Sequence, residues 1–194
     1  MRAKGMGMNR FENLAGRMRA AHGSWQMAVE DLTLEHVNHH ERPGVLPIAF
    51  SLMHLVNTED VRSSERLDGG EPIWVSGGWE DKVGVNVPAV FRGTPMEVAE
   101  SLRFRDVDAW REYQTAVFAK TIDLLTRTED GRWDEIYADA VPGAMSRGFL
   151  ALLCGDGPVT LGNYLEVVLY HHSLRHLGEL EHARALVGLG GVGG

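Results

Sequence analysis

Histidine is the residue type whose spacing in this sequence points most directly to chemistry. The chain contains nine histidines among 194 residues, and the spacing His-x3-His occurs twice, as His36/His40 and His172/His176. Residues four apart project from nearly the same face of an α-helix, so such a pair can present two imidazoles to one metal ion. Because this spacing also arises by chance, the surroundings of each pair must distinguish them.

The pair His172/His176 continues an apolar face of a predicted helix. One and two turns earlier, that face carries Leu165, Val168 and Leu169. We therefore expect both imidazoles to point toward the core. Burying two imidazoles side by side is costly unless each has a partner, and one shared cation supplies a partner for both. The pair is a candidate for two ligands of a metal ion.

Glu179 lies on the same face, three residues after His176. Its carboxylate could be a fourth ligand, a hydrogen-bond acceptor that orients a histidine, or a general base. The other pair, His36/His40, lies in a polar stretch over residues 36–44 that contains a proline and a glycine. That composition is typical of a loop, so we expect these two histidines to be exposed to solvent.

A metal site on one helix needs a further ligand from another helix, and His54 is the natural candidate. It lies midway along a helix predicted over residues 47–67, on a face shared with Phe50 and Asn57. A single histidine at such a position is more often a core residue with a hydrogen-bond partner, so His54 alone does not define a site. His22 falls between the apolar positions of the first predicted helix, and we do not assign it a role.

Two of these segments resemble conserved motifs of the DinB-like superfamily. They are the stretch His54-Leu-Val-Asn-Thr-Glu-Asp60 and the closing stretch His172-Ser-Leu-Arg-His-Leu-Gly-Glu-Leu180. The resemblance implies a four-helix bundle, commonly homodimeric, that holds a divalent metal on three histidines. Carried over by motif, the ligands are His54, His172 and His176. Characterised relatives include thiol-dependent transferases and isomerases, such as mycothiol-dependent maleylpyruvate isomerase.

Three neutral imidazoles leave coordination positions open for water or substrate, as in a catalytic metal site. Zn, Ni, Fe and Mn all suit such a donor set. The first hypothesis is an enzyme that activates a low-molecular-weight thiol on the metal for attack on a small-molecule substrate. The thiol would come from outside the chain, because Cys154 is the only cysteine and its surroundings suggest a small apolar filler.

Three other hypotheses remain open. One is metal-assisted hydrolysis, with Glu179 as the general base on a metal-bound water. Another is a binding or sensing dimer in which the metal is structural and nothing turns over. The last is a helical dimer without a metal, in which the buried histidines are only core residues.

The elements that must position these residues are predicted by hydrophobic periodicity. Apolar residues recur at steps of three and four over residues 11–32, 47–67, 106–127 and 160–187, which predicts four long amphipathic helices. Asp106 and Thr160 are expected N-caps, and the segment starting at Thr94 matches a capping box. Residues 68–93 form a long ordered connector between the second and third helices, in which Trp74 and Trp79 are expected anchors.

The fold class that follows is an all-α four-helix bundle in a single domain over residues 1–194. We expect a core over about residues 9–187 and a flexible glycine-rich tail over residues 188–194. Arg175 and Arg184 in the last predicted helix are expected to be surface ion-pair residues.

Composition narrows the partners and the compartment. Lys plus Arg number 19 and Asp plus Glu 27, which gives a formal net charge of −8. This acidic balance argues against nucleic acid or an anionic membrane as the main partner. Residues 1–8 lack the apolar stretch of a signal peptide, and a single cysteine fits a reducing compartment. We therefore expect a cytoplasmic protein that acts on a small molecule, as a homodimer if the resemblance holds.

Overall fold

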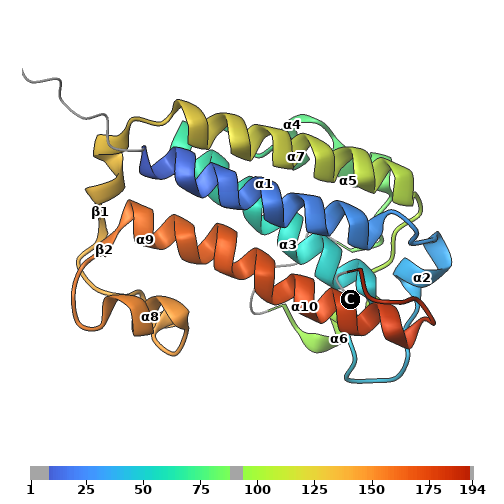
Figure 1. Ribbon diagram of the computed structural model, residues 1–194. Coiled ribbons are helices and arrows are strands. Elements are labelled where there is room, and N and C mark those ends of the chain that lie inside the picture. The colour runs from blue at the N-terminus through green and yellow to red at the C-terminus, as the bar shows by residue number, and fades with distance from the viewer. Residues whose placement is uncertain (1–8, 88–93, 193–194) are drawn as a thin grey trace, which may run out of the picture.

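The computed structural model describes residues 9–87 and 94–192, and it is a bundle of four long helices (Figure 1). The expectations for residues 1–8, for the end of the connector at 88–93 and for the last two glycines lie outside the described residues. The first and third long helices are α1 (Arg10–Val29) and α7 (Val107–Arg127). The predicted all-α fold is thus confirmed.

The second and fourth long helices each contain a π-helical segment. The second joins α3 (Ile48–Ser63) to η1 (Ser64–Asp68), and the fourth runs without a break through α9 (Leu161–Leu165), η4 (Glu166–His171) and α10 (His172–Leu186). A π turn is rare in proteins and is found mostly as a single turn within an α-helix, often beside a functional site. The one in the fourth helix ends directly before His172.

Side-chain caps explain where the third and fourth long helices begin. The carboxylate of Asp106 accepts hydrogen bonds from the backbone amides of Asp108 and Ala109 at the start of α7, and the hydroxyl of Thr160 accepts one from Asn163. Both caps were predicted from the sequence and are confirmed. The second helix ends at Gly69, whose φ of 67° is the left-handed conformation that glycine adopts without strain.

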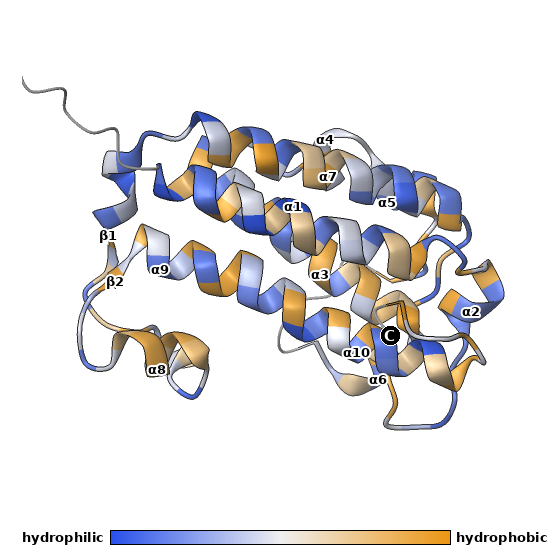
Figure 2. Cartoon of the chain, in the orientation of Figure 1, coloured by the Kyte–Doolittle hydropathy of each residue, from blue (hydrophilic) through white to orange (hydrophobic). Residues whose placement is uncertain are grey.

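The remaining elements are short. They are α2 (Leu34–Asn38), α4 (Ile73–Ser76), α5 (Trp79–Val83), α6 (Met96–Ser101), η2 (Asp130–Asp134), β1 (Ile136–Ala138), η3 (Gly143–Met145), α8 (Phe149–Cys154) and β2 (Val159–Thr160). The two strands pair antiparallel, with Ile136 opposite Thr160. The helix α8 lies to one side of the bundle and is strongly apolar (Figures 1 and 2), and it packs on the bundle through Leu150, which is buried, and Phe149, which stacks on His171. No helix in the described ranges is both long and apolar enough to cross a membrane.

The connector is held on the bundle by one buried carboxylate. Asp60 accepts hydrogen bonds from the backbone amides of Ile73 and Trp74 at 3.0 and 2.8 Å, and from the hydroxyl of Tyr113 at 3.1 Å. The indole of Trp74 is 5 % exposed and packs edge-on against Tyr113. Trp74 is therefore an anchor, as the sequence predicted, and Trp79 also packs beside Tyr113.

Several local expectations were wrong. The first three residues of the loop predicted over 36–44 belong instead to the short helix α2, because the hydroxyl of Thr33 caps this helix and the ring of His36 accepts a hydrogen bond from the Thr33 amide. The helix α6 begins at Met96 with Pro95 as its N-cap, one residue later than the capping-box motif predicted. The strand pair β1–β2 was not predicted, since strands of two or three residues are too short to show alternation.

The inward face of the fourth helix also differs from the predicted stripe. Val167 is buried where Val168 was expected, and beyond the π turn the buried residues are Ser173, His176, Leu180 and Arg184. The extra residue in the π turn shifts the phase of the helix, so a stripe drawn at a constant 3.6-residue period fails there. As a result His172 is half-buried at the edge of that face.

Arg184 was expected on the surface and is instead 3 % exposed. Its guanidinium donates to the carbonyl of Ala28 at 2.7 Å and to the carboxylate of Asp31 at 2.5 Å, which joins α10 to the end of α1. The tail beyond α10, which the sequence predicts to be flexible, contacts this region: Arg184 Nε donates to the carbonyl of Gly190, and the amide of Val192 donates to Glu181.

Candidate metal centre

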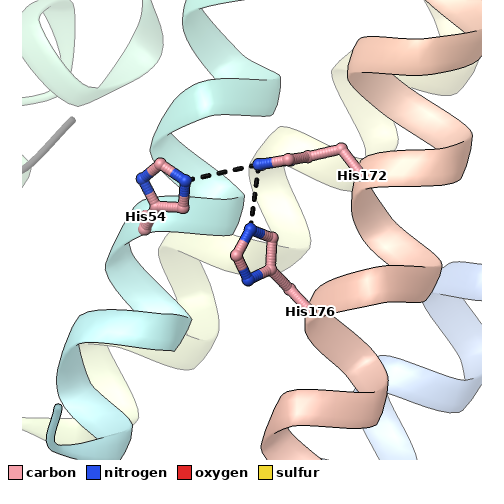
Figure 3. A group of neighbouring side chains, drawn as sticks. All are labelled: His54, His172 and His176. Carbon is pink, nitrogen blue, oxygen red and sulfur yellow. Dashed lines mark hydrogen bonds between the residues drawn. The ribbon is translucent and has the colours of Figure 1, made fainter. Parts of the chain in front are cut away.

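The three predicted ligands meet between α3 and α10. His54 projects from the middle of α3, and His172 and His176 project from the first turns of α10 toward it (Figure 3). The Nε2 atom of His172 lies 3.3 Å from Nε2 of His54 and 3.0 Å from Nε2 of His176. One nitrogen from each ring falls within 4.8 Å of the others. The sequence thus predicted a set of side chains that the fold brings together.

Burial keeps the imidazoles of the α10 pair neutral. It lowers the pKa of His172 to about 2, and the neighbouring His176, His54 and Arg175 act in the same direction. Burial also lowers the pKa of His176, although the adjacent Glu179 carboxylate opposes that shift. Neutral imidazole is the form that ligates metals, because its unprotonated nitrogen carries a free lone pair.

Glu179 fixes the tautomer of His176. Its Oε2 atom lies 2.5 Å from Nδ1 of His176, and an ionised carboxylate only accepts hydrogen bonds. Nδ1 of His176 therefore carries the hydrogen, as assigned from this contact, and Nε2 directs its lone pair toward the other two rings. Histidine ligands in metalloproteins are commonly oriented by a carboxylate in this way.

Hydrogen bonds among the three rings cannot account for both Nε2 contacts of His172. With the hydrogen of His176 on Nδ1, its Nε2 can only accept, so His172 would have to donate from Nε2. If Nε2 of His172 donates its hydrogen to His176, it has no lone pair left to accept a hydrogen bond from His54. Its single hydrogen is also already used, so it cannot donate to His54 either. The Nδ1 atom of His172 is buried and has no hydrogen-bond partner among the described residues. A cation between the Nε2 lone pairs removes this mismatch, so the donor set fits a metal ion.

Arg175 also reaches this centre, which the sequence did not reveal. Its Nη2 atom lies 3.3 Å from Nε2 of His176, and its Nε lies 3.5 Å from Oε1 of Glu179. We expected Arg175 to be a surface ion-pair residue, and the ion pair with Glu179 is present. The signal for its second contact was its place in the sequence, directly before one ligand and four residues before Glu179.

His22 is a second residue that the sequence analysis left without a role. It is 5 % exposed, its Nε2 lies 3.0 Å from Glu59 Oε1, and its ring stacks on Phe118 with centroids 3.7 Å apart. The pair lies inside the bundle between α1 and α3. Of the other histidines, His40 lies 3.6 Å from Glu100, away from the three-histidine cluster.

Comparisons with known proteins agree with this fold. A sequence profile described as the DinB superfamily matches residues 17–180, a range that includes all three clustered histidines. A crystal structure of a conserved protein from Enterococcus faecalis superposes with a TM-score of 0.74 at 17 % identity, over 94 % of this chain and 99 % of that one. No protein of curated function matches the sequence significantly. The profile match covers most of the chain, and the chain belongs to the DinB superfamily.

Proposed function

We propose that this protein binds one divalent metal ion on His54, His172 and His176 and uses it to activate a small thiol or a water molecule. The observation that carries the proposal is the convergence of three Nε2 atoms whose contacts cannot all be hydrogen bonds. Membership of the DinB superfamily adds support, since that resemblance implies a three-histidine metal site. The metal could be Zn, Ni, Fe or Mn, because imidazole suits each of them.

The chemistry of such an ion favours an enzyme over a closed structural site. A divalent metal on three neutral imidazoles keeps open positions, where it stabilises a thiolate or lowers the pKa of a bound water. The chain supplies no thiol there: Cys154 lies in α8, where the side-chain amide of Asn163 contacts its sulfur at 3.6 Å. A thiol-dependent transferase or isomerase would therefore use a low-molecular-weight thiol as its nucleophile.

Glu179 is better placed to orient His176 than to act as a base. Its carboxylate contacts Nδ1, which is on the opposite side of the ring from Nε2 and the cluster centre. A base for a bound water would instead need to reach the open side of the centre. This placement favours the thiol reaction over hydrolysis with Glu179 as the base, and the hydrolase remains the alternative.

Metal content tests the first part of the proposal. Protein purified without a histidine tag should carry about one divalent ion per chain, and His172→Ala should lose it. His182→Ala is the matched control, because His182 is exposed on the same helix. A metal-free wild type that also fails to bind added Zn, Ni or Mn would refute the metal site.

Reaction class is tested next, on the metal-loaded protein. Low-molecular-weight thiols, including mycothiol and bacillithiol, are offered with a panel of electrophiles, and activated esters are offered without thiol. Conjugation that requires both the thiol and the bound metal supports the transferase. Ester hydrolysis that Glu179→Gln abolishes supports the hydrolase, and no turnover on either panel favours a binding or sensing protein.

We also propose the homodimer that the family resemblance implies. The chain mass is 21.4 kDa, so light scattering on the eluted peak distinguishes a monomer from a species of twice that mass.

A further inference from the structure

We propose that Arg175 selects substrates or cosubstrates that carry a carboxylate, and this inference rests on the metal site proposed above. Arg175 brings a guanidinium within 3.3 Å of Nε2 of His176, on the side of the ring that faces the three-histidine centre. In the wild-type chain it is thus a permanently charged donor next to the place where a small molecule would bind.

The hydrogen-bonding capacity of Arg175 is only partly used. One contact is to the lone pair of His176 Nε2, which is the lone pair that a metal would take. The other is the pair with Glu179 at 3.5 Å, a carboxylate whose second oxygen is already committed to His176 Nδ1. With the metal bound, Nη2 loses its acceptor and has to find another, and a carboxylate matches the fork of a guanidinium best.

The charges around the centre favour the same class of ligand. Arg175 and Glu179 both contact His176 and pair with each other, so their opposite charges cancel. A divalent ion then leaves the site with an excess positive charge, which attracts anions. A ligand with a thiolate or an oxygen at the centre and a carboxylate beside it would pair one negative group with the metal ion and the other with the Arg175 guanidinium.

A purely structural role for Arg175 explains less. The side chains of Arg175 and Glu179 are 60 % and 51 % exposed, and an ion pair between two such groups contributes little to stability. Glu179 can hold His176 without Arg175, since its contact to Nδ1 is the shorter one. The packing of the described residues therefore does not require an arginine at this position.

The test measures binding of matched small probes to Co²⁺-loaded protein, read from the visible absorption of the metal and from calorimetry. The thiol pair is 3-mercaptopropionate and its neutral amide, 3-mercaptopropionamide; the thiol-free pair is propionate and propionamide. Wild type should prefer the carboxylate of a pair by about tenfold, as one charge-assisted hydrogen bond gives. Arg175→Gln should remove most of that preference and leave only what the metal charge supplies, and Arg175→Lys should keep more of it.

Arg19→Gln is the matched control, because Arg19 is exposed on α1 and changes the net charge of the protein equally. A preference confined to the thiol pair assigns the carboxylate to the thiol cosubstrate, and a preference in both pairs extends it to the electrophile. Equal preference in wild type and Arg175→Gln, or no probe binding to metal-loaded protein, overturns the inference about Arg175 alone. A wild type that holds no metal overturns the proposed function, and this inference with it.

Discussion

The helix α3 presents two buried polar clusters that differ in how their hydrogen bonds are matched. Around Asp60, donors converge on an acceptor: two backbone amides, the Tyr113 hydroxyl and the Ser64 hydroxyl all point at one carboxylate. Around His54, the Nε2 atoms of three imidazole rings face one another, and no set of tautomers consistent with Glu179 satisfies both contacts of His172. The Asp60 carboxylate is matched by donors within the chain, whereas the contacts among the three histidines are mismatched, and a cation would remove that mismatch.

This difference separates a structural site from a candidate functional one. Buried polar groups are nearly always paired in native proteins, so a matched network such as that of Asp60 needs no further explanation. A mismatched group of buried nitrogens costs stability in the metal-free protein, and such a cost persists where the site serves a ligand. Substitutions around Asp60 should therefore lower the free energy of unfolding, and substitutions among the three histidines should instead lower the metal affinity.

The largest expected effect is on folding, from Asp60→Ala. The substitution leaves two amides and the Tyr113 hydroxyl without their buried acceptor and releases the start of α4. We expect the free energy of unfolding of the metal-free protein to fall by about 3–5 kcal/mol, the usual cost of removing one partner from a buried charged network. Urea titration measures it. A loss below about 1 kcal/mol would mean that Asp60 does not pin the connector.

Substitution in the other cluster should do the reverse. His54→Ala removes one of three ligands, and we expect metal affinity to fall at least about 100-fold while the metal-free protein unfolds at nearly the same urea concentration as wild type. Competition with a chromogenic chelator gives the affinity, with His182→Ala as control. If His54→Ala instead destabilised the metal-free fold as strongly as Asp60→Ala, the three histidines would be core residues.

A smaller effect is expected from Glu179→Gln, which weakens the orientation of one ligand and leaves all three in place. The amide can still accept from His176 Nδ1, but without the charge that strengthens this hydrogen bond. We expect metal affinity to fall about 10-fold and no more than about 100-fold, as is usual for the acceptor behind a ligating histidine. Unchanged affinity would show that Glu179 does not hold the ligand.

The sequence predicted the ligands better than their surroundings, for physical reasons. Helical stripes and N-caps depend on nearby residues, so spacing alone predicted the four helices and the caps Asp106 and Thr160. The family resemblance then predicted that His54 faces the histidine pair of α10. The π turn before His172 has no local pattern in the sequence, so the stripe was misassigned at Val168.

The position of the end of a long side chain is also hard to predict from the sequence. Arg184 was expected on the surface because arginine is seldom fully buried, yet it lies under the tail with Asp31 and the Ala28 carbonyl as partners. The contact of Arg175 with His176 likewise depends on the rotamer that a long side chain adopts. Periodicity gives the face of a helix from which a side chain starts, and it does not give where four flexible bonds end.

The smallest expected effect concerns a third polar contact, Asp31 with Arg184, which combines a buried partner and an exposed one. The guanidinium holds the pKa of Asp31 below its ordinary value. A carboxyl whose pKa is lowered by folding stabilises the protein fully above its unfolded pKa, near 3.9, and loses that contribution as the pH falls through the folded value.

Because the Asp31 side chain is 52 % exposed, solvent screens the pair, and we expect its contribution at pH 7 to be about 1 kcal/mol or less. Urea unfolding of wild type and Asp31→Asn should differ by this amount at pH 7, and the difference should shrink as the pH falls below about 3.9, the unfolded pKa of Asp31. Arg184 keeps the carbonyls of Ala28 and Gly190 in the variant, so the fold should persist. A difference that did not shrink in acid would mean that Asp31 acts through something other than its charge, and exposure would then be a poor guide to which polar contacts of this bundle matter.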